Sequence, residues 1–189
     1  MTVSKEQRSY VAKLHQVVDG LVADLFNRHG SALQCKLGCT DCCTDGLTVL
    51  EAEASLIAEH HAELLEHGSP HPVGACAFLD KDGACRIYPN RPYVCRTQGL
   101  PLRWLELDAS INPPQPIEYR DVCPINAPQL PALASLSVAD LWSIGPFEHR
   151  LAILGAPSEH DSATDAPPPK RLPLRALFRH VKYSSHVQS

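Results

Sequence analysis

Aromatic side chains are scarce in this chain, and long apolar runs are absent. Only 6% of its 189 residues are Phe, Trp or Tyr, so we expect a core built from Leu, Val, Ile and Ala. No apolar run approaches the roughly 18 residues that a transmembrane helix needs, which predicts no membrane-spanning segment. The polar N-terminus lacks the apolar stretch of a secretory signal. We therefore expect a cytoplasmic protein.

Positive charge is also in short supply. The formal net charge is −4, so no global basic field favours nucleic acid as a partner. The exception is the C-terminal region, where five basic residues and no acidic one follow position 169: Lys170, Arg171, Arg175, Arg179 and Lys182. The sequence also lacks a Ser-His-Asp order, a P-loop and a dinucleotide fingerprint. It therefore leaves open whether the protein is an enzyme, and it assigns no catalytic residue.

Cysteine, in contrast, is abundant, with eight residues in the chain. Stable disulfides are rare in the reducing cytosol, where metal ligation is the commonest reason for so many cysteines. Four of them fall within nine residues in the order C-x3-C-x2-C-C, and thiolates spaced this closely can converge on one ion at little entropic cost. Buried free thiols and a disulfide framework are the alternatives. All eight are candidate metal ligands: Cys35, Cys39, Cys42, Cys43, Cys76, Cys85, Cys95 and Cys123.

The adjacent residues Cys42 and Cys43 help to distinguish a single metal ion from a polynuclear centre. Their Cα atoms are about 3.8 Å apart across a trans peptide, whereas a disulfide prefers about 4.4–6.8 Å. Adjacent side chains tend to diverge, so two metals sharing the loop, or a polynuclear cluster, would suit this pair better than one zinc ion. Two four-thiolate sites and one cluster with a few structural thiols are both compatible with the sequence.

The cysteine pattern resembles a known family. The run CKLGCTDCC, then Cys76-Ala-Phe-Leu, then CRIYPNRPYVCR and a late cysteine resemble the CxxCxxCC cysteine-cluster family, also called YkgJ-like or the zinc- or iron-chelating domain. The family segment "IY-x-x-RP-x-x-CR" is matched by Ile87, Tyr88, Arg91, Pro92, Cys95 and Arg96. The resemblance covers roughly residues 30–125, with three residues rather than two between Cys35 and Cys39.

The resemblance implies a metal- or cluster-binding module without a defined reaction. A similar module occurs in flagellin lysine methylases, but no glycine-rich loop or carboxylate pattern here supports methyl transfer. Sulfur-only ligation suits both zinc and iron–sulfur clusters, and the adjacent cysteines favour a cluster. We expect an iron–sulfur protein with a redox, sensing or accessory role and an unidentified protein or redox partner. A Zn2+-stabilised interaction module without redox activity is the alternative.

Arg91 and Arg96 flank Cys95 and are candidate cofactor-binding residues. A guanidinium beside a thiolate or an anionic cluster lowers the cost of its negative charge. An ordinary surface or salt-bridge role is the other interpretation.

The expected fold is a small α+β, mostly helical domain around a cysteine-rich metal centre. Hydrophobic periodicity predicts helices over residues 4–28, 48–67 and 137–154. Ser4 would cap the start of the first helix and Gly30 its end, while Thr48 and Glu51 have the form of a capping box for the second.

One short β-hairpin is expected, with Phe78-Leu79 and Cys85–Tyr88 flanking the turn Asp80–Gly83. We expect residues 98–135 to be irregular because they carry many prolines. Residues 1–154 are predicted to form a single metal-binding domain with its motif core at 30–125. Residues 155–189 are predicted to be a flexible linker and a basic tail.

Overall fold

The computed structural model describes residues 3–36, 38–154 and 170–178, and these form an α+β fold with two small sheets. The helices are α1 (Lys5–His29), α2 (Glu51–His60), α3 (Ala62–His67), α4 (Tyr93–Arg96) and α5 (Pro146–Ile153). The strands are β1 (Thr48–Leu50), β2 (Leu102–Asp108), β3 (Gln115–Asp121), β4 (Trp142–Ser143) and β5 (Arg171–Pro173). The predicted fold class is confirmed at this coarse level. None of the described helices is long and apolar enough to cross a bilayer.

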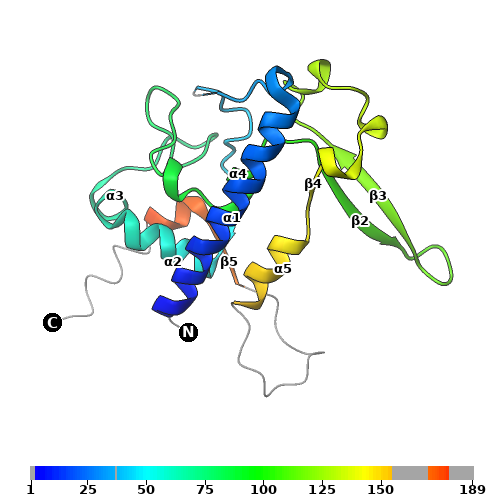
Figure 1. Cartoon of the computed structure of the whole chain (residues 1–189). Helices are drawn as coiled ribbons and strands as arrows, with labels where there is room; N and C mark the ends of the chain where they lie inside the picture. The colour runs from blue at the N-terminus through cyan, green and yellow to red at the C-terminus, as the bar shows by residue number, and fades with distance from the viewer. Residues whose placement is uncertain (1–2, 37, 155–169, 179–189) are drawn as a thin grey trace.

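Helix α1 is the longest element and crosses the molecule (Figure 1). The Ser4 side chain accepts a hydrogen bond from the Gln7 N–H, and Gln7 Oε1 accepts one from the Ser4 N–H, which completes a capping box. At the other end Gly30 has a φ of 55°, a left-handed conformation that glycine adopts without strain. The first predicted helix and both of its predicted ends are confirmed.

A buried polar contact fixes α1 against the elements that carry the motif. His15 Nε2 lies 3.0 Å from Glu53 Oε1 on α2, and the same oxygen accepts the Tyr93 N–H of α4 at 2.7 Å. The Tyr93 hydroxyl in turn accepts the Trp142 indole N–H at 2.9 Å. Because these buried groups bond one another, their desolvation is compensated, and α1, α2, α4 and β4 keep fixed relative positions.

The predicted second helix begins later than expected. Thr48 does not cap it, because Thr48–Leu50 forms strand β1 and α2 starts at Glu51 without a side-chain cap. The helix also breaks at His61, which separates α2 from α3. The capping-box pattern was wrong here because the Thr48 side chain is engaged by Arg171 of β5, which donates to its hydroxyl at 2.9 Å.

Strand β5 comes from the region that the sequence assigns to a flexible linker and tail. It pairs antiparallel with β1, with Val49 opposite Leu172. The residues that follow it, Leu174, Leu177 and Phe178, are buried in a core cluster with Val49 and Phe78. The expectation of a flexible linker and tail is therefore wrong for residues 170–178, while 155–169 and 179–189 lie outside the described residues. The domain boundary at residue 154 stays a prediction.

The largest sheet forms where irregular chain was expected. Strands β2 and β3, of seven residues each, form an antiparallel hairpin that extends from the body of the molecule (Figure 1). Strand β4 pairs parallel with β2 on the other side. Trp104 stacks on Tyr119 across the pair. The prediction of irregular chain from the proline content was wrong here. Pro116 lies in β3, an edge strand, where a missing N–H is tolerated.

Two further predicted elements differ from the structure. The predicted hairpin at Phe78–Tyr88 keeps its turn, in which Asp80 accepts N–H groups from Asp82 and Ala84, but only one bridge, Leu79 to Cys85, joins its sides. The region predicted as one helix, 137–154, consists of a short 3-10 turn, strand β4 and α5, which begins at Pro146 after Gly145.

Candidate metal centre

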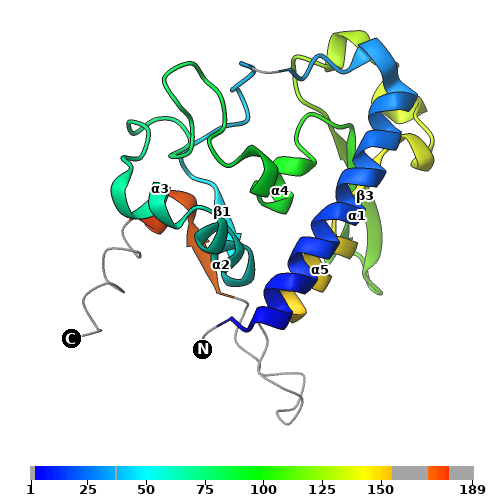
Figure 2. The same cartoon turned by 60° about the vertical axis from the view of Figure 1, so that its left-hand side comes forward.

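The cysteine-bearing loops lie together on one side of α1 and around the start of α4. Figures 1 and 2 both show the loop that follows α1 beside the loops that precede α4. The contact is direct, since the Cys76 N–H donates to the Cys43 carbonyl at 2.8 Å. The eight cysteines are all free; Cys76 is buried and the others are half-buried.

As the side chains stand in the described part of the chain, no three His, Cys, Asp or Glu side chains converge tightly enough to hold one metal ion. The cysteines are therefore brought near one another without a closed coordination shell. Their roles as ligands stay a prediction, and the hydrogen bonds around each one define how the protein positions it.

Asn126 organises the surroundings of Cys35. It is fully buried, and its Nδ2 donates to Cys35 Sγ at 3.4 Å and to the Gly99 carbonyl at 2.7 Å. Its Oδ1 accepts the Gln34 N–H at 2.8 Å, and its own N–H donates to the Cys123 carbonyl at 2.9 Å. Asn126 thus ties Cys35, which lies 91 residues earlier in the chain, to Cys123 through its side chain and its backbone N–H. A donor aimed at sulfur is the support that a thiolate ligand needs.

Gly99 lies directly against the Cys35 side chain. Its φ is +88°, and a Cβ added there would overlap Cys35 Sγ. Glycine is therefore required at position 99 for two reasons: the backbone is left-handed there, and any side chain would displace the Cys35 sulfur. Together, Asn126 and Gly99 fix where Cys35 Sγ lies.

Burial raises the pKa of the Cys35 thiol, and the Asn126 hydrogen bond opposes that rise. Cys39, Cys123 and Cys42 raise this pKa further, because nearby thiolates repel a new negative charge. These three cysteines are therefore within electrostatic reach of Cys35.

A second group of cysteines belongs to the core cluster under α2 and β5. Cys76 is part of that cluster, and Cys43 and Cys85 pack against it. The Leu79 N–H donates to the Cys76 carbonyl at 3.1 Å, and Leu79 bridges to Cys85. Phe78 packs inside this cluster, whereas Tyr88 is exposed and lies under the Arg91 guanidinium.

Cys42 and Cys43 shift each other's pKa in opposite directions. A hydrogen bond from the Cys43 thiol is the largest of the effects that lower the pKa of Cys42, to about 6. The same bond, together with burial and the nearby Cys42, Cys76 and Cys95, strongly raises the pKa of Cys43. The pair therefore holds its first negative charge readily and resists a second.

Burial also raises the pKa values of Cys76, Cys85 and Cys95, the last to about 12. Cys76, Cys85 and Cys42 add to the effect on Cys95. Guanidinium groups oppose the rise at two of these sites: Arg175 and Arg86 lower the pKa of Cys76, and Arg91 and Arg86 lower that of Cys85. Thiolates in this group would thus be stabilised by arginine.

The two predicted cofactor-binding arginines have different surroundings. Arg91 lies near Cys85 and over the Tyr88 ring. Arg96 is buried and bonds Asp19 at 2.5 Å and the Pro89 carbonyl at 2.9 Å, so its charge is compensated by α1. The structure thus gives Arg96 a role in joining α4 to α1.

Arg175 is a site residue that the sequence did not reveal. Its guanidinium binds Asp45 of the cysteine loop, the segment that carries Cys39, Cys42 and Cys43. It also binds the carbonyls of His71, Pro72 and Ala75, which precede Cys76. The only sequence signal was its place in a basic segment, which we interpreted as a tail. Nothing in the local pattern connects it to a loop about 100 residues earlier.

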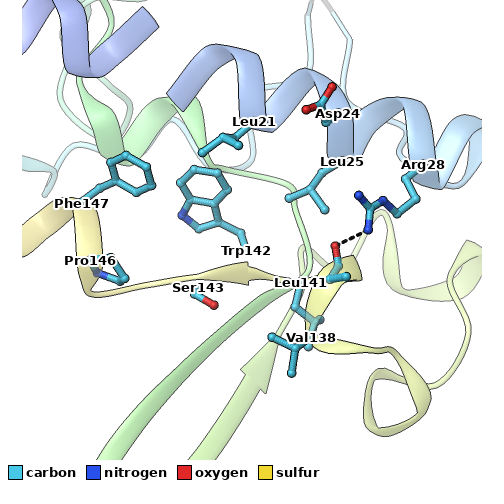
Figure 3. A pocket seen from close by; sticks show the side chains of 11 residues that line it. Leu21, Asp24, Leu25, Arg28, Val138, Leu141, Trp142, Ser143, Pro146 and Phe147 are labelled. Atoms are coloured by element: carbon cyan, nitrogen blue, oxygen red, sulfur yellow. Dashed lines mark hydrogen bonds between the residues drawn. The ribbon is translucent and has the colours of Figure 1, made fainter. Parts of the chain in front are cut away.

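A separate hollow of about 320 Å³ lies between α1 and the β4–α5 segment (Figure 3). Leu21, Leu25, Trp142 and Phe147 make it mostly apolar, and Arg28 donates to the Ala139 carbonyl at its rim. No cysteine lines it, so it is distinct from the candidate metal centre.

The donors present fit a thiolate-bound metal or cluster. They are eight free sulfurs in half-buried loops, with an amide donor on one of them and arginines beside others. Residues 34–113 match the family model CxxCxxCC, described as a putative zinc- or iron-chelating domain. The family predicted from the cysteine pattern is confirmed for this segment, which contains every cysteine except Cys123. No curated protein and no solved structure matched the chain.

Proposed function

We propose that this protein binds an iron–sulfur cluster through its cysteine thiolates and has a redox, sensing or accessory role. The observation that carries the proposal is the assembly of free cysteines from distant segments around shared hydrogen bonds, as between Cys35 and Cys123 through Asn126. The family description supports metal binding and names both zinc and iron.

All eight cysteines are the proposed ligand pool, and a bound cluster would supply one-electron chemistry. The protein's contribution is to hold the sulfurs, limit their exposure and offset their charge through Arg86, Arg91 and Arg175. Such a site requires reduced thiols, which a cytoplasmic location would provide. The alternative, structural zinc, is favoured by the same all-sulfur donor set.

The test is metal analysis of the full chain purified without oxygen. We expect a brown protein with visible charge-transfer absorbance and with iron and sulfide in equal amounts. Colourless protein that holds zinc at full occupancy, and takes up no iron after anaerobic reconstitution, would replace the cluster with the zinc alternative.

Variants at the adjacent cysteines test ligation. Cys42→Ser and Cys43→Ser should each reduce bound metal and lower Tm together, because metal binding and folding are coupled. Thr44→Ser, an exposed neighbour in the same loop, is the matched control and should change neither. Unchanged metal content in both cysteine variants would remove them from the ligand set.

A further inference from the structure

We propose that the eight cysteines form two separate four-thiolate metal sites, Cys35/Cys39/Cys42/Cys123 and Cys43/Cys76/Cys85/Cys95, which meet at the Cys42–Cys43 peptide. This inference rests on the proposed metal binding, and it assigns each sulfur to a site.

The first set is built around Asn126. Its side chain donates to Cys35 Sγ, and its N–H and that of Ala127 both donate to the Cys123 carbonyl, so Cys123 opens the turn that carries Asn126. The Cys39 N–H donates to the carbonyl of Lys36, the residue after Cys35, at 3.0 Å. These bonds bring both ends of the motif to one place.

The second set is built around the loop at Cys76. The Cys76 N–H binds the Cys43 carbonyl, and Leu79 links Cys76 to Cys85 through a turn and a bridge. Three of the four sulfurs belong to, or pack against, one core cluster. None of the first set is in that cluster or the other one that the structure describes.

Cys95 joins the second set through consecutive tight turns. The Tyr88 N–H binds the Cys85 carbonyl, the Arg91 N–H binds the Tyr88 carbonyl, and the Cys95 N–H binds the Pro92 carbonyl. These turns fold the chain back between Cys85 and Cys95.

Cys42 is the junction between the sets. It directly precedes Cys43 and follows Cys39 of the first set by three residues. We assign it to the first set because Cys43, whose carbonyl holds Cys76, already completes the second. Four sulfurs are the number that one tetrahedral zinc ion or one iron–sulfur cluster takes.

The decisive measurement needs no substitution. The reduced full chain is loaded with less than two equivalents of Zn2+, alkylated with iodoacetamide, and weighed intact. We expect molecules with eight, four or no alkyl groups, and fragmentation should place the four groups on one complete set. Labels spread over both sets within single molecules would overturn the division.

Double variants give a second test. Cys35→Ser/Cys123→Ser and Cys76→Ser/Cys85→Ser each damage one set and should each retain one equivalent of tightly bound zinc. The cross pair Cys35→Ser/Cys85→Ser damages both sets and should weaken both equivalents at least tenfold. Equal losses in all three variants would contradict two sites, provided that circular dichroism shows α1 folded.

The two proposals fail in different ways. If the wild-type chain retains neither zinc nor iron after anaerobic loading, metal binding itself is wrong. If it binds metal but protects its cysteines in another grouping, metal binding stands and only this division is wrong.

Discussion

At the residue scale, Gly99 and Asn126 place Cys35 without being possible thiolate ligands themselves. Neither position stands out in the sequence, because a glycine in a loop and an asparagine near prolines have many uses. Their role follows only from the tertiary contact between residues 34–35, 99 and 123–126.

Gly99→Ala tests that contact. The added methyl group meets Cys35 Sγ and must adopt a φ of +88°, so we expect the free energy of unfolding to fall by about 2 kcal/mol or more. Bound metal should fall with it. Urea unfolding and metal analysis measure both quantities.

Gly46→Ala is the matched control for Gly99→Ala. It lies in the cysteine loop with no atom within 4 Å of the added Cβ, and we expect its unfolding free energy to change by less than about 0.5 kcal/mol. Equal effects of the two substitutions would show that Gly99 has no special contact with Cys35.

The Cys42–Cys43 pair predicts an order of reactivity. In folded protein with chelator present, Cys42 should react first with iodoacetamide, with a half-maximal rate near its pKa of about 6. Its rate should rise through that pH and level off above it, since the thiolate is the nucleophile. Cys43, whose pKa is strongly raised, and Cys95, with a pKa of about 12, should react last.

Peptide mass spectrometry at a series of pH values measures these rates, and urea-unfolded protein is the control. In the unfolded protein, Cys42 and Cys95 should both titrate near the ordinary pKa of a free cysteine, about 8.5. A Cys42 rate that still rises between pH 8 and 9 in the folded chain would contradict the prediction.

At the scale of elements, the C-terminal segment is the largest difference between expectation and structure. Its β5 strand and its three buried apolar residues have no strong local signal, because three-residue strands carry little periodicity. Arg175 adds a long-range clamp on the loop before Cys76. Sequence patterns report local preference, and this element exists through partners about 100 residues away.

Arg175→Ala should therefore loosen the cysteine loops. Loss of its bonds to the His71, Pro72 and Ala75 carbonyls should reduce the free energy of unfolding by about 2–3 kcal/mol and weaken metal binding. Arg171→Ala in the same segment removes exposed bonds to Thr48 only, so we expect about 1 kcal/mol or less. Denaturant unfolding and metal titration compare the two variants.

Whether the other elements could be predicted depends on whether local or long-range contacts stabilise them. Helix α1, with its periodic apolar stripe and its capping residues, was predicted almost residue by residue. Strands β2 and β3 were missed because each is stabilised mainly by the other, and proline counts carry no information on which strand is an edge. For the site, the sequence identified the sulfurs but not the residues that position them.

At the scale of the whole molecule, cysteines pack into one of the two core clusters and not into the other. The cluster along α1 contains no cysteine, whereas the cluster around Phe78 and Phe178 includes Cys76 and contacts Cys43 and Cys85. Metal should therefore stabilise one part of the protein much more than the other.

Metal removal tests this difference. Under reducing conditions with chelator, amide hydrogens in residues 71–96 should exchange roughly 100-fold faster, while the centre of α1 should change little. Hydrogen-exchange mass spectrometry measures both regions in one sample, and readdition of metal should restore protection. Uniform loss of protection across both regions would mean that the molecule unfolds as one unit without its metal.

The Arg175 clamp also has a consequence for protein synthesis. All eight thiols have been translated by residue 123, and about 50 more residues are added before Arg175. At about 5–20 residues per second this interval lasts roughly 3–10 seconds on the ribosome. During it, the nascent chain carries every sulfur without the arginine that secures the Cys76 loop, so this is the period in which it is most open to oxidation or to capture of the wrong ion.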